Sequence, residues 1–358
     1  MLLVLLLSLI CTIVSVSGFG TPTSLVITGA SGYLGREIVH SILDNDVLQD
    51  SNIVCLVREH RIEDECQYWE DNKAVKVMPY DMLDDGKTVE DALSTVFQNE
   101  NEKCCILHVA SVFTPTEEHE QMALDNVKGA EDLMNAVAKF PVEKTRVILT
   151  SSMAGVRGSG QIPENGKFYT EKDWNTQSEL GANWGASYQW SKATSEQRAW
   201  DIAKEKNINF TGLCPSFIFG PPSDAKSSES FSISTVRKWI FGEGPVQSRL
   251  CVDVRDVALA HVQAAIRDCT INERIIVSTE ARIPSEKMAE ELKKMSTEMG
   301  IGAPDKIYAD TEFSGGAIQI GDKEVGCYER MESLLDLKPR SVEETMSDMA
   351  KVLLELEK

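Results

Sequence analysis

A regular alternation of short apolar runs and longer amphipathic runs constrains the fold of this chain more than any other feature. The apolar runs are rich in valine and isoleucine, and the segments between them repeat apolar residues every three or four positions. Strands that are apolar throughout are typical of parallel sheets covered by helices on both faces. The alternation therefore predicts an α/β fold with a doubly wound parallel sheet of the Rossmann type. The apolar runs are SLVIT (24–28), NIVCLV (52–57), AVKVMPY (74–80), CCILHVA (104–110) and RVILTSS (146–152).

The sequence changes character after the glycine and prolines at 220–222. Residues 223–232 are polar and rich in serine, which is typical of a loop. Helix and strand patterns resume beyond that loop, and the last helices are highly charged. We therefore expect a Rossmann domain and a smaller α/β cap at the carboxyl edge of its sheet. The expected Rossmann domain is 22–220, with 251–268 packed back on it, and the expected cap is 221–250 with 269–358.

The chain begins with an apolar leader at residues 1–18. Its apolar run from Leu2 to Val16 would span about 22 Å as a helix, which is short for a hydrocarbon core of roughly 30 Å. Small residues at its end suit a cleavage site. We expect a signal peptide that leads into the secretory pathway, to the endoplasmic reticulum or to a plastid reached through it. The alternatives are an uncleaved membrane anchor with the rest of the chain in the cytosol, or a buried strand.

The charged and sulfur-containing residues exclude several classes of protein. The formal net charge is −20, and no cluster of Lys and Arg resembles a nucleic-acid patch. An anionic ligand would therefore need a local basic site set against the overall field. The nine cysteines lack the paired spacing of a disulfide framework or a zinc site. None of the five histidines has a recognisable triad or metal spacing, and His108, at a strand end, is expected to be structural.

Residues 28–35, TGASGYLG, join the first apolar run to the first amphipathic run. Three glycines spaced three apart at a strand-to-helix junction fit a dinucleotide-binding turn. Gly29 allows the tight turn, Gly32 allows close approach to a pyrophosphate, and Gly35 allows the helix to pack on the strand. Backbone amides at the helix start then attract the phosphates.

The residue at the end of the second strand predicts which dinucleotide binds. An NAD site usually has Asp or Glu there, to accept a hydrogen bond from the ribose 2′-hydroxyl. This strand ends in Arg58, whose guanidinium can hold a 2′-phosphate, and Arg36 in the first helix is a second candidate. NADP(H) is therefore the expected cofactor. Glu59 keeps NAD(H) open, and an Arg58 that is only a surface residue is the alternative.

A second motif is YQWSK, at 188–192. Spacing of four residues places the Tyr188 phenol and the Lys192 ammonium on one helix face. A nearby cation lowers a phenol pKa, so that Tyr188 can exchange a proton with a carbonyl or alcohol. The run RVILTSS ends in Ser151 and Ser152, at the sheet edge where such folds bind ligands. A serine hydroxyl there can hold the same oxygen.

Taken in order, these motifs resemble the extended short-chain dehydrogenase/reductase family, which includes the NAD-dependent epimerases and dehydratases. The resemblance is strongest to the branch of dihydroflavonol reductases, cinnamoyl-CoA reductases and yeast-type aldehyde reductases. It covers residues 22–280 well and the last eighty loosely. The matching segments are TGASGYLG, Arg58, DML (81–83), ILHVAS (106–111), RVILTSS, YQWSK and GLCPSFIFGPP (212–222).

The resemblance implies a role for each matching residue. Ser152 holds the substrate oxygen, Tyr188 is the general acid, and Lys192 lowers the tyrosine pKa and holds the nicotinamide ribose. No metal is implied. The implied cofactor contacts are Gly29, Ser31, Gly32, Tyr33, Leu34, Gly35, Arg36, Arg58, Asp81, Met82, Ala110, Ser111, Tyr188, Lys192, Pro215, Ser216 and Phe217.

The sequence predicts an NADP(H)-dependent oxidoreductase that moves a hydride between nicotinamide and the carbonyl or alcohol of a small organic substrate. Arg157 stands five residues past Ser152, where the plant enzymes would place Asn or Tyr, so a flavonoid substrate is not implied. Arg157 either pairs with an acidic substrate or faces water. Two alternatives remain, an NAD-dependent sugar-nucleotide epimerase or dehydratase and a non-catalytic NADP-binding regulator. A homodimer through helices 116–140 and 184–206 also remains open.

Overall fold

The computed structural model describes residues 18–164, 166, 168–225, 229–310 and 328–356. The expected leader, apart from Gly18, lies outside the described residues. Among the helices that are described, none combines the length and the apolar character needed to cross a membrane.

The centre of the molecule is a seven-stranded sheet in the order β3-β2-β1-β4-β5-β6-β9, with every pair parallel. The predicted doubly wound α/β fold is therefore confirmed. The chain reverses direction across the sheet between β1 and β4, which is where such folds bind ligands. The strands are β1 (Ser24–Thr28), β2 (Asn52–Val57), β3 (Val75–Pro79), β4 (Cys104–His108), β5 (Thr145–Thr150), β6 (Asn209–Pro215) and β9 (Glu273–Val277).

Helices cover both faces of the sheet because alternate strand residues point to opposite sides. On one face, Leu25 and Ile27 of β1 join a core with α2 (Tyr33–Leu43), α9 (Val254–Ile266) and α11 (Glu329–Leu335). On the other face, Val26 joins a core with three further helices. These are α4 (Lys87–Val96), α5 (His119–Val137) and α7 (Trp184–Lys206). The short elements are α3 (Ile62–Tyr68), α6 (Met153–Val156) and the 3-10 turns η1 (Glu59–Arg61), η2 (Val142–Lys144), η4 (Asp268–Thr270) and η5 (Pro304–Lys306).

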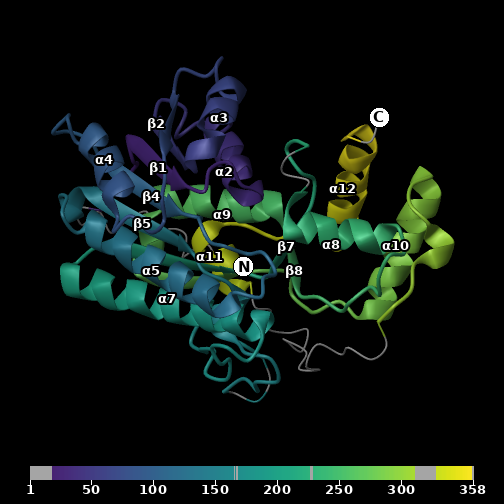
Figure 1. The fold of residues 1–358 in the computed structure, drawn as a ribbon. Helices are drawn as coiled ribbons and strands as arrows, with labels where there is room; N and C mark the ends of the chain where they lie inside the picture. The colour runs from purple at the N-terminus through teal and green to yellow at the C-terminus, as the bar shows by residue number, and fades with distance from the viewer. Residues whose placement is uncertain (1–17, 165, 167, 226–228, 311–327, 357–358) are drawn as a thin grey trace, which may run out of the picture.

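A cap with its own apolar core stands beside the carboxyl edge of the sheet, to the right in Figure 1. In the part of the chain that the structure describes, it contains a two-stranded parallel sheet and three α-helices. These are β7 (Phe217–Phe219), β8 (Cys251–Asp253), α8 (Phe231–Ile240), α10 (Ser285–Met299) and α12 (Val342–Leu356).

The structure corrects the expected domain bounds at four elements. Strands β7 and β8 fall within 22–220 and 251–268, which were assigned to the Rossmann domain, but they pair with each other as the small sheet of the cap. Both β9 and α11 fall within 269–358, which was assigned to the cap. Instead, β9 pairs with β6 as the last strand of the main sheet, and α11 packs in the core beneath it. The reason is that the apolar run of β9 completes an otherwise open edge of β6 and becomes buried there.

Candidate active site

The glycine turn between β1 and α2 is held against the end of β4. Gly29 has φ +69° and donates its backbone N–H to the Leu56 carbonyl at 3.0 Å. A Cβ added at Gly29 would lie 3.0 Å from the Ala110 Cα, and one at Gly35 would overlap the Gly29 carbonyl oxygen. Gly32 caps α2 without a side-chain hydrogen bond, so the first amides of the helix stay open. An anion can therefore reach them.

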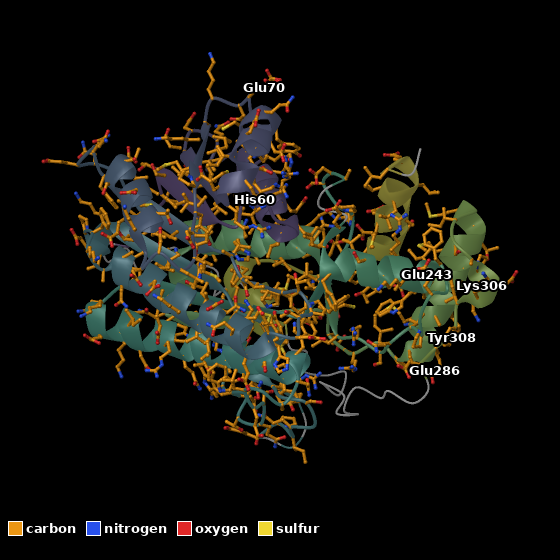
Figure 2. All side chains as sticks on the ribbon, in the orientation of Figure 1. His60, Glu70, Glu243, Glu286, Lys306 and Tyr308 are labelled. Atoms are coloured by element: carbon orange, nitrogen blue, oxygen red, sulfur yellow. The ribbon has the colours of Figure 1, made fainter. Side chains whose placement is uncertain are left out.

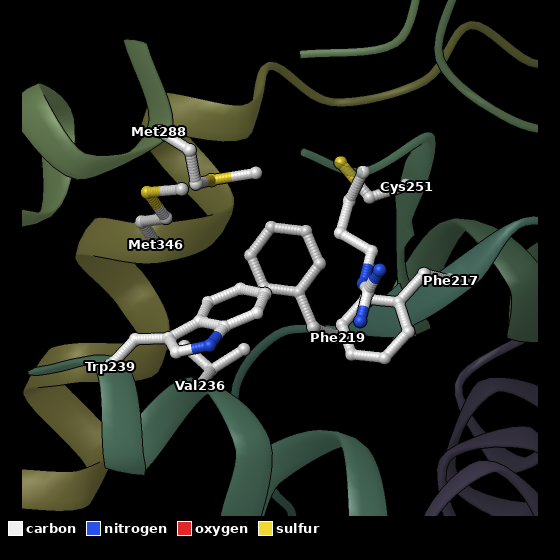
Figure 3. Close-up of a pocket in the computed structure, with 8 residues that line it drawn as sticks. Phe217, Phe219, Val236, Trp239, Cys251, Met288 and Met346 are labelled. Carbon is white, nitrogen blue, oxygen red and sulfur yellow. The ribbon is translucent and has the colours of Figure 1, made fainter. Parts of the chain in front are cut away.

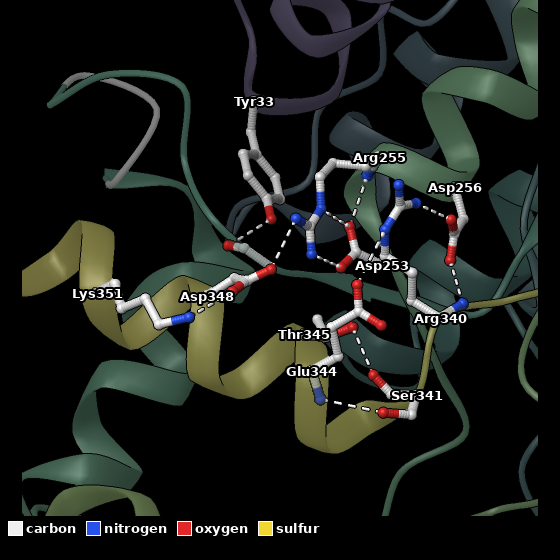
Figure 4. Close-up of polar contacts among 11 residues, drawn as sticks. Tyr33, Asp253, Arg255, Asp256, Arg340, Ser341, Glu344, Thr345, Asp348 and Lys351 are labelled. Atoms are coloured by element: carbon white, nitrogen blue, oxygen red, sulfur yellow. Dashed lines mark hydrogen bonds and ion pairs between the residues drawn. The ribbon is translucent and has the colours of Figure 1, made fainter. Parts of the chain in front are cut away.

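The other residues of this turn have different surroundings. Ser31 is half-buried and Leu34 is buried in the core beneath α2. The Tyr33 hydroxyl donates to the Gly220 carbonyl at 3.0 Å, at the junction with the cap. Burial, reinforced by the Asp253 carboxylate, raises the Tyr33 pKa well above its usual value. Tyr33 thus connects the glycine turn to the cap, as Figure 4 shows.

The two arginines predicted to hold a 2′-phosphate differ in their surroundings. Arg58 directly follows β2 and is exposed, next to the His60 that Figure 2 marks. Arg36 is buried, and its guanidinium forms ion pairs with Glu65 and Asp224. The prediction for Arg36 is corrected, because its charge is already balanced inside the protein. Arg58 remains the candidate ligand of the phosphate.

The remaining predicted cofactor residues lie on the ends of neighbouring strands and their loops. The Asp81 carboxylate accepts from the Leu83 N–H at 2.9 Å, and Met82 lies against Gly129 of α5. The backbone N–H of Ala110 donates to the Thr28 hydroxyl at 3.1 Å. Ser111 Oγ is buried with no hydrogen-bond partner among the described residues, and the same holds for Ser216 Oγ. Two such hydroxyls and a glycine cradle fit a dinucleotide, since buried polar groups are normally paired.

Pro215, Ser216 and Phe217 form the passage from the main sheet into the cap. Pro215 pairs with Val277 at the end of β6. The Ser216 N–H donates to the Val277 carbonyl at 3.1 Å, and the Phe217 N–H donates to the Leu250 carbonyl at 3.0 Å. The segment is therefore fixed between the two parts of the molecule.

The structure brings the three predicted catalytic residues together. Ser152 caps α6 at the end of β5, and its hydroxyl accepts from the Ala154 N–H at 3.1 Å. Ser152 lies near enough to Tyr188 to lower the pKa of its phenol. Lys192 Nζ lies 5.9 Å from the centre of the Tyr188 ring and donates to the Thr150 carbonyl at 3.2 Å. Strand β5 and helix α7 thus converge on one point.

Burial dominates the protonation of this group. It raises the Tyr188 pKa well above its usual value, and the neighbouring Ser152 hydroxyl acts in the opposite direction. Burial lowers the pKa of Lys192 to about 8, against the attraction of the Glu196 carboxylate. Both effects follow from desolvation, which disfavours the charged form of either group.

Aromatic side chains form an apolar wall around Tyr188. The Phe113 ring lies 4.5 Å from the Tyr188 ring and 4.9 Å from Phe231 of the cap, between ring centres. Trp184, one turn before Tyr188, lies 5.5 Å from Phe113. A ligand beside Tyr188 therefore meets rings from both the main domain and the cap.

Sequence reasoning missed Glu196, which is fully buried behind the site. Its carboxylate accepts from Ser151 Oγ at 2.6 Å and pairs with Arg274 of β9. The signal was present, because Glu196 follows Lys192 by four residues on the same face of α7. His108 is buried and contacts the Thr28 hydroxyl through Nδ1 at 2.8 Å.

Three comparisons with known proteins agree with this geometry. The model of the NAD dependent epimerase/dehydratase family matches residues 25–276. The NADPH-dependent methylglyoxal reductase of Saccharomyces cerevisiae is 26% identical over 363 residues, which covers 93% of this chain and 99% of that protein. Cinnamoyl-CoA reductase 1 of Arabidopsis thaliana is 35% identical over 166 residues, 44% of each chain. The crystal structure of the yeast methylglyoxal/isovaleraldehyde reductase with NADPH superposes with a TM-score of 0.74 at 24% identity, covering 93% of this chain and 99% of that one.

Proposed function

The chain belongs to the NAD dependent epimerase/dehydratase family, and from this premise we propose that it is an NADPH-dependent reductase of small aldehydes or ketones. The observation that carries the proposal is the convergence of Ser152, Tyr188 and Lys192 beside the glycine turn. Similarity to the yeast NADPH-dependent methylglyoxal reductase along almost the whole chain supports the cofactor and the carbonyl substrate.

The residues of this chain that would hold NADPH lie at the carboxyl edge of the main sheet. The open amides of α2 would bind the pyrophosphate and Arg58 the 2′-phosphate, and the Ser111 and Ser216 hydroxyls would be available to the ribose and nicotinamide. When bound, the cofactor supplies the hydride that reduces the carbonyl carbon.

Side chains of the protein bind the substrate oxygen and donate the proton to it. The Ser152 hydroxyl holds the carbonyl oxygen next to Tyr188. Because burial disfavours the phenolate, Tyr188 keeps its proton at neutral pH, and the phenol would donate this proton to the substrate oxygen as negative charge develops there. Lys192, with a pKa near 8, is mostly protonated at pH 7 and orients groups at the end of β5. The rings of Phe113, Trp184 and Phe231 give the site an apolar wall.

The decisive experiment measures NADPH consumption with a panel of aldehydes and ketones for the wild type and for Tyr188→Phe. Removing the phenol hydroxyl should lower kcat by about 10²- to 10⁴-fold. Binding of NADPH, followed by its fluorescence, should be retained. Tyr308→Phe is the matched control, because Tyr308 is exposed on the cap, as Figure 2 shows. Full activity in Tyr188→Phe would contradict the proposed mechanism.

The epimerase or dehydratase alternative predicts a different result for the purified protein. Such enzymes would retain NAD during purification and would not consume added NADPH. The exposed Arg58 at the end of β2, where an acidic residue would accept from an NAD ribose, supports the reductase. NAD that stays bound to the purified protein would favour the epimerase or dehydratase over the reductase.

We also propose that residues 1–18 act as a signal peptide. Their apolar run and small final residues support cleavage near Phe19. Amino-terminal sequencing of the protein isolated from its own cells should find a start close to Phe19. An intact Met1 in a membrane fraction would support the anchor instead.

A homodimer through α5 and α7 is a further proposal. Leu124 on α5 is 43% exposed, and the adjoining α7 contributes a second long surface helix. Light scattering after size exclusion should give twice the chain mass, and Leu124→Glu should halve it. A wild-type monomer would exclude the dimer.

A further inference from the structure

The guanidinium groups of Arg249 and Arg282, at the base of the cap, both contact Ser248. The backbone of Arg249 pairs with that of Ile283, with N···O distances of 3.1 and 2.7 Å, so Arg282 lies next to Arg249. Arg282 donates through Nη2 to the Ser248 carbonyl at 2.8 Å, and Arg249 approaches the same oxygen through Nη1 at 3.5 Å. Arg282 Nε also donates to Ser248 Oγ at 2.8 Å. The two guanidinium groups thus share one anchoring residue.

These two arginines lack the acidic partners that other arginines of the cap region have. Figure 4 shows Arg255 paired with Asp253 and Asp348, and Arg340 paired with Asp256. Within the described part of the chain, no carboxylate forms an ion pair with Arg249 or Arg282. This is unexpected in a protein with 56 acidic and 36 basic side chains. An anionic ligand would supply the negative charge that these two guanidinium groups lack.

The charged groups around the pair are mostly repulsive. Burial lowers the Arg249 pKa, as does the positive charge of Arg157, while Cys251 and the Asp310 carboxylate raise it. Burial lowers the Arg282 pKa to about 10, with further contributions from Arg157 and Arg249. Arg157 is therefore the third member of this cluster, and its positive charge also acts against the burial that raises the Tyr169 pKa.

The arginine cluster adjoins the active site through a small apolar core. Leu250, directly after Arg249, packs with Met153 and Val156, which lie between Ser152 and Arg157. The Arg249 guanidinium lies 5.3 Å from the centre of the Phe217 ring. The recess behind it, lined by Phe217, Phe219 and Trp239, is filled by side chains and leaves no room for a water molecule (Figure 3). The recess supports Arg249 from behind, and a ligand meets its half-exposed outer side.

Helix α8 spans the distance between the cluster and the catalytic tyrosine. Its first residue, Phe231, meets the Phe113 ring edge to face beside Tyr188, and the Trp239 ring lies 5.8 Å from the Arg249 guanidinium. Eight residues of helix correspond to about 12 Å. A ligand that reaches both ends therefore has an apolar spacer between its two polar groups.

From these observations we propose that the carbonyl substrate carries an anionic group, a carboxylate or a phosphate, which binds Arg249 and Arg282 while the carbonyl lies at Tyr188. Guanidinium groups bind such anions through paired, charge-assisted hydrogen bonds. The inference rests on the proposed reductase function and defines its substrate class.

The test compares each acid with an uncharged analogue of the same shape. ω-Oxo acids of four, six and eight carbons are assayed against their methyl esters, and ω-oxoalkyl phosphates of the same chain lengths are assayed against the corresponding hydroxyaldehydes. The wild type should prefer one charged member by about tenfold or more in kcat/KM, mainly through KM, and spacer length and headgroup identify which. Arg249→Gln and Arg282→Gln should bring that ratio close to one. Arg237→Gln, an exposed arginine beside Phe241 on the cap, should keep it.

A binding measurement separates the two proposals. Titration of the NADP⁺ complex with adipate and with inorganic phosphate, followed by calorimetry, needs no turnover. Binding that Arg249→Gln abolishes supports the anion site even in a protein that reduces none of the carbonyls, and only the reductase proposal then fails. Reduction of the esters and of the hydroxyaldehydes, without preference for or binding of any anion, overturns this inference and leaves the reductase proposal intact.

Discussion

The Arg274 guanidinium holds the Glu196 carboxylate by two hydrogen bonds, from Nε at 2.6 Å and from Nη2 at 2.9 Å. Arg274 comes from β9 and Glu196 from α7, so the pair connects the edge of the sheet to the helix that carries Tyr188. Glu196 also accepts from Ser151, next to Ser152. The buried pair therefore fixes α7 relative to the end of β5.

Removing one partner of this pair should destabilise the fold strongly. Arg274→Met leaves a buried, uncompensated carboxylate, and we expect a loss of about 3–5 kcal/mol in the free energy of unfolding in urea. The double variant with Glu196→Met should lose less than the sum of the single variants. Arg198→Met, which breaks an exposed pair with Glu131, should cost about 1 kcal/mol or less. Equal losses at both sites would contradict this reading.

Acid should destabilise the protein through His261. Its Nε2 contacts the Thr150 hydroxyl at 2.7 Å and its Nδ1 the Val257 carbonyl at 2.8 Å, and burial lowers its pKa to about 4. The unfolded chain, with a histidine pKa near 6.5, then binds more protons between pH 6.5 and 4. Above pH 6.5, His261 makes its whole contribution to the free energy of unfolding. About 3 kcal/mol of that contribution is lost when the pH falls to 4.

Comparison of variants isolates that contribution. Unfolding free energies measured from pH 7 to 4 should fall less steeply for His261→Gln than for the wild type. The exposed His60→Gln should follow the wild-type slope. If His261→Gln has the wild-type slope, another group is responsible.

The third glycine of the turn should tolerate no side chain. A Cβ at Gly35 overlaps the Gly29 carbonyl, so Gly35→Ala must displace the turn from α2. We expect a loss of about 1–3 kcal/mol in stability, and weaker NADPH binding because the amides move. Gly244→Ala is the control, since its Cβ would meet nothing within 4 Å. A thermal shift assay with and without NADPH measures both effects, and a fully active Gly35→Ala would contradict the cradle.

Arg58→Ala should weaken NADPH binding and leave NADH binding unchanged. Loss of charge-assisted hydrogen bonds worth about 1.5–3 kcal/mol corresponds to roughly a 10- to 150-fold rise in Kd. Cofactor fluorescence titration measures both constants. An unchanged preference for NADPH would show that another cation holds the 2′-phosphate.

Local patterns in the sequence were sufficient to predict much of the fold and of the candidate active site. The run of β1, the glycine turn and the start of α2 are contiguous, so their geometry follows from neighbouring residues. Helix periodicity alone placed Tyr188 and Lys192 on one face, and strand ends placed Arg58 and Ser152 at one edge of the sheet.

Contacts between distant segments decided the rest. Arg36 resembled a phosphate ligand until the fold brought Glu65 and Asp224 to it, 29 and 188 residues away. Contacts between separated segments also place β9 in the main sheet and bring Arg249 next to Arg282. Periodicity reports only which face of an element is buried, whereas the partner of a buried charge is determined by which elements pack together.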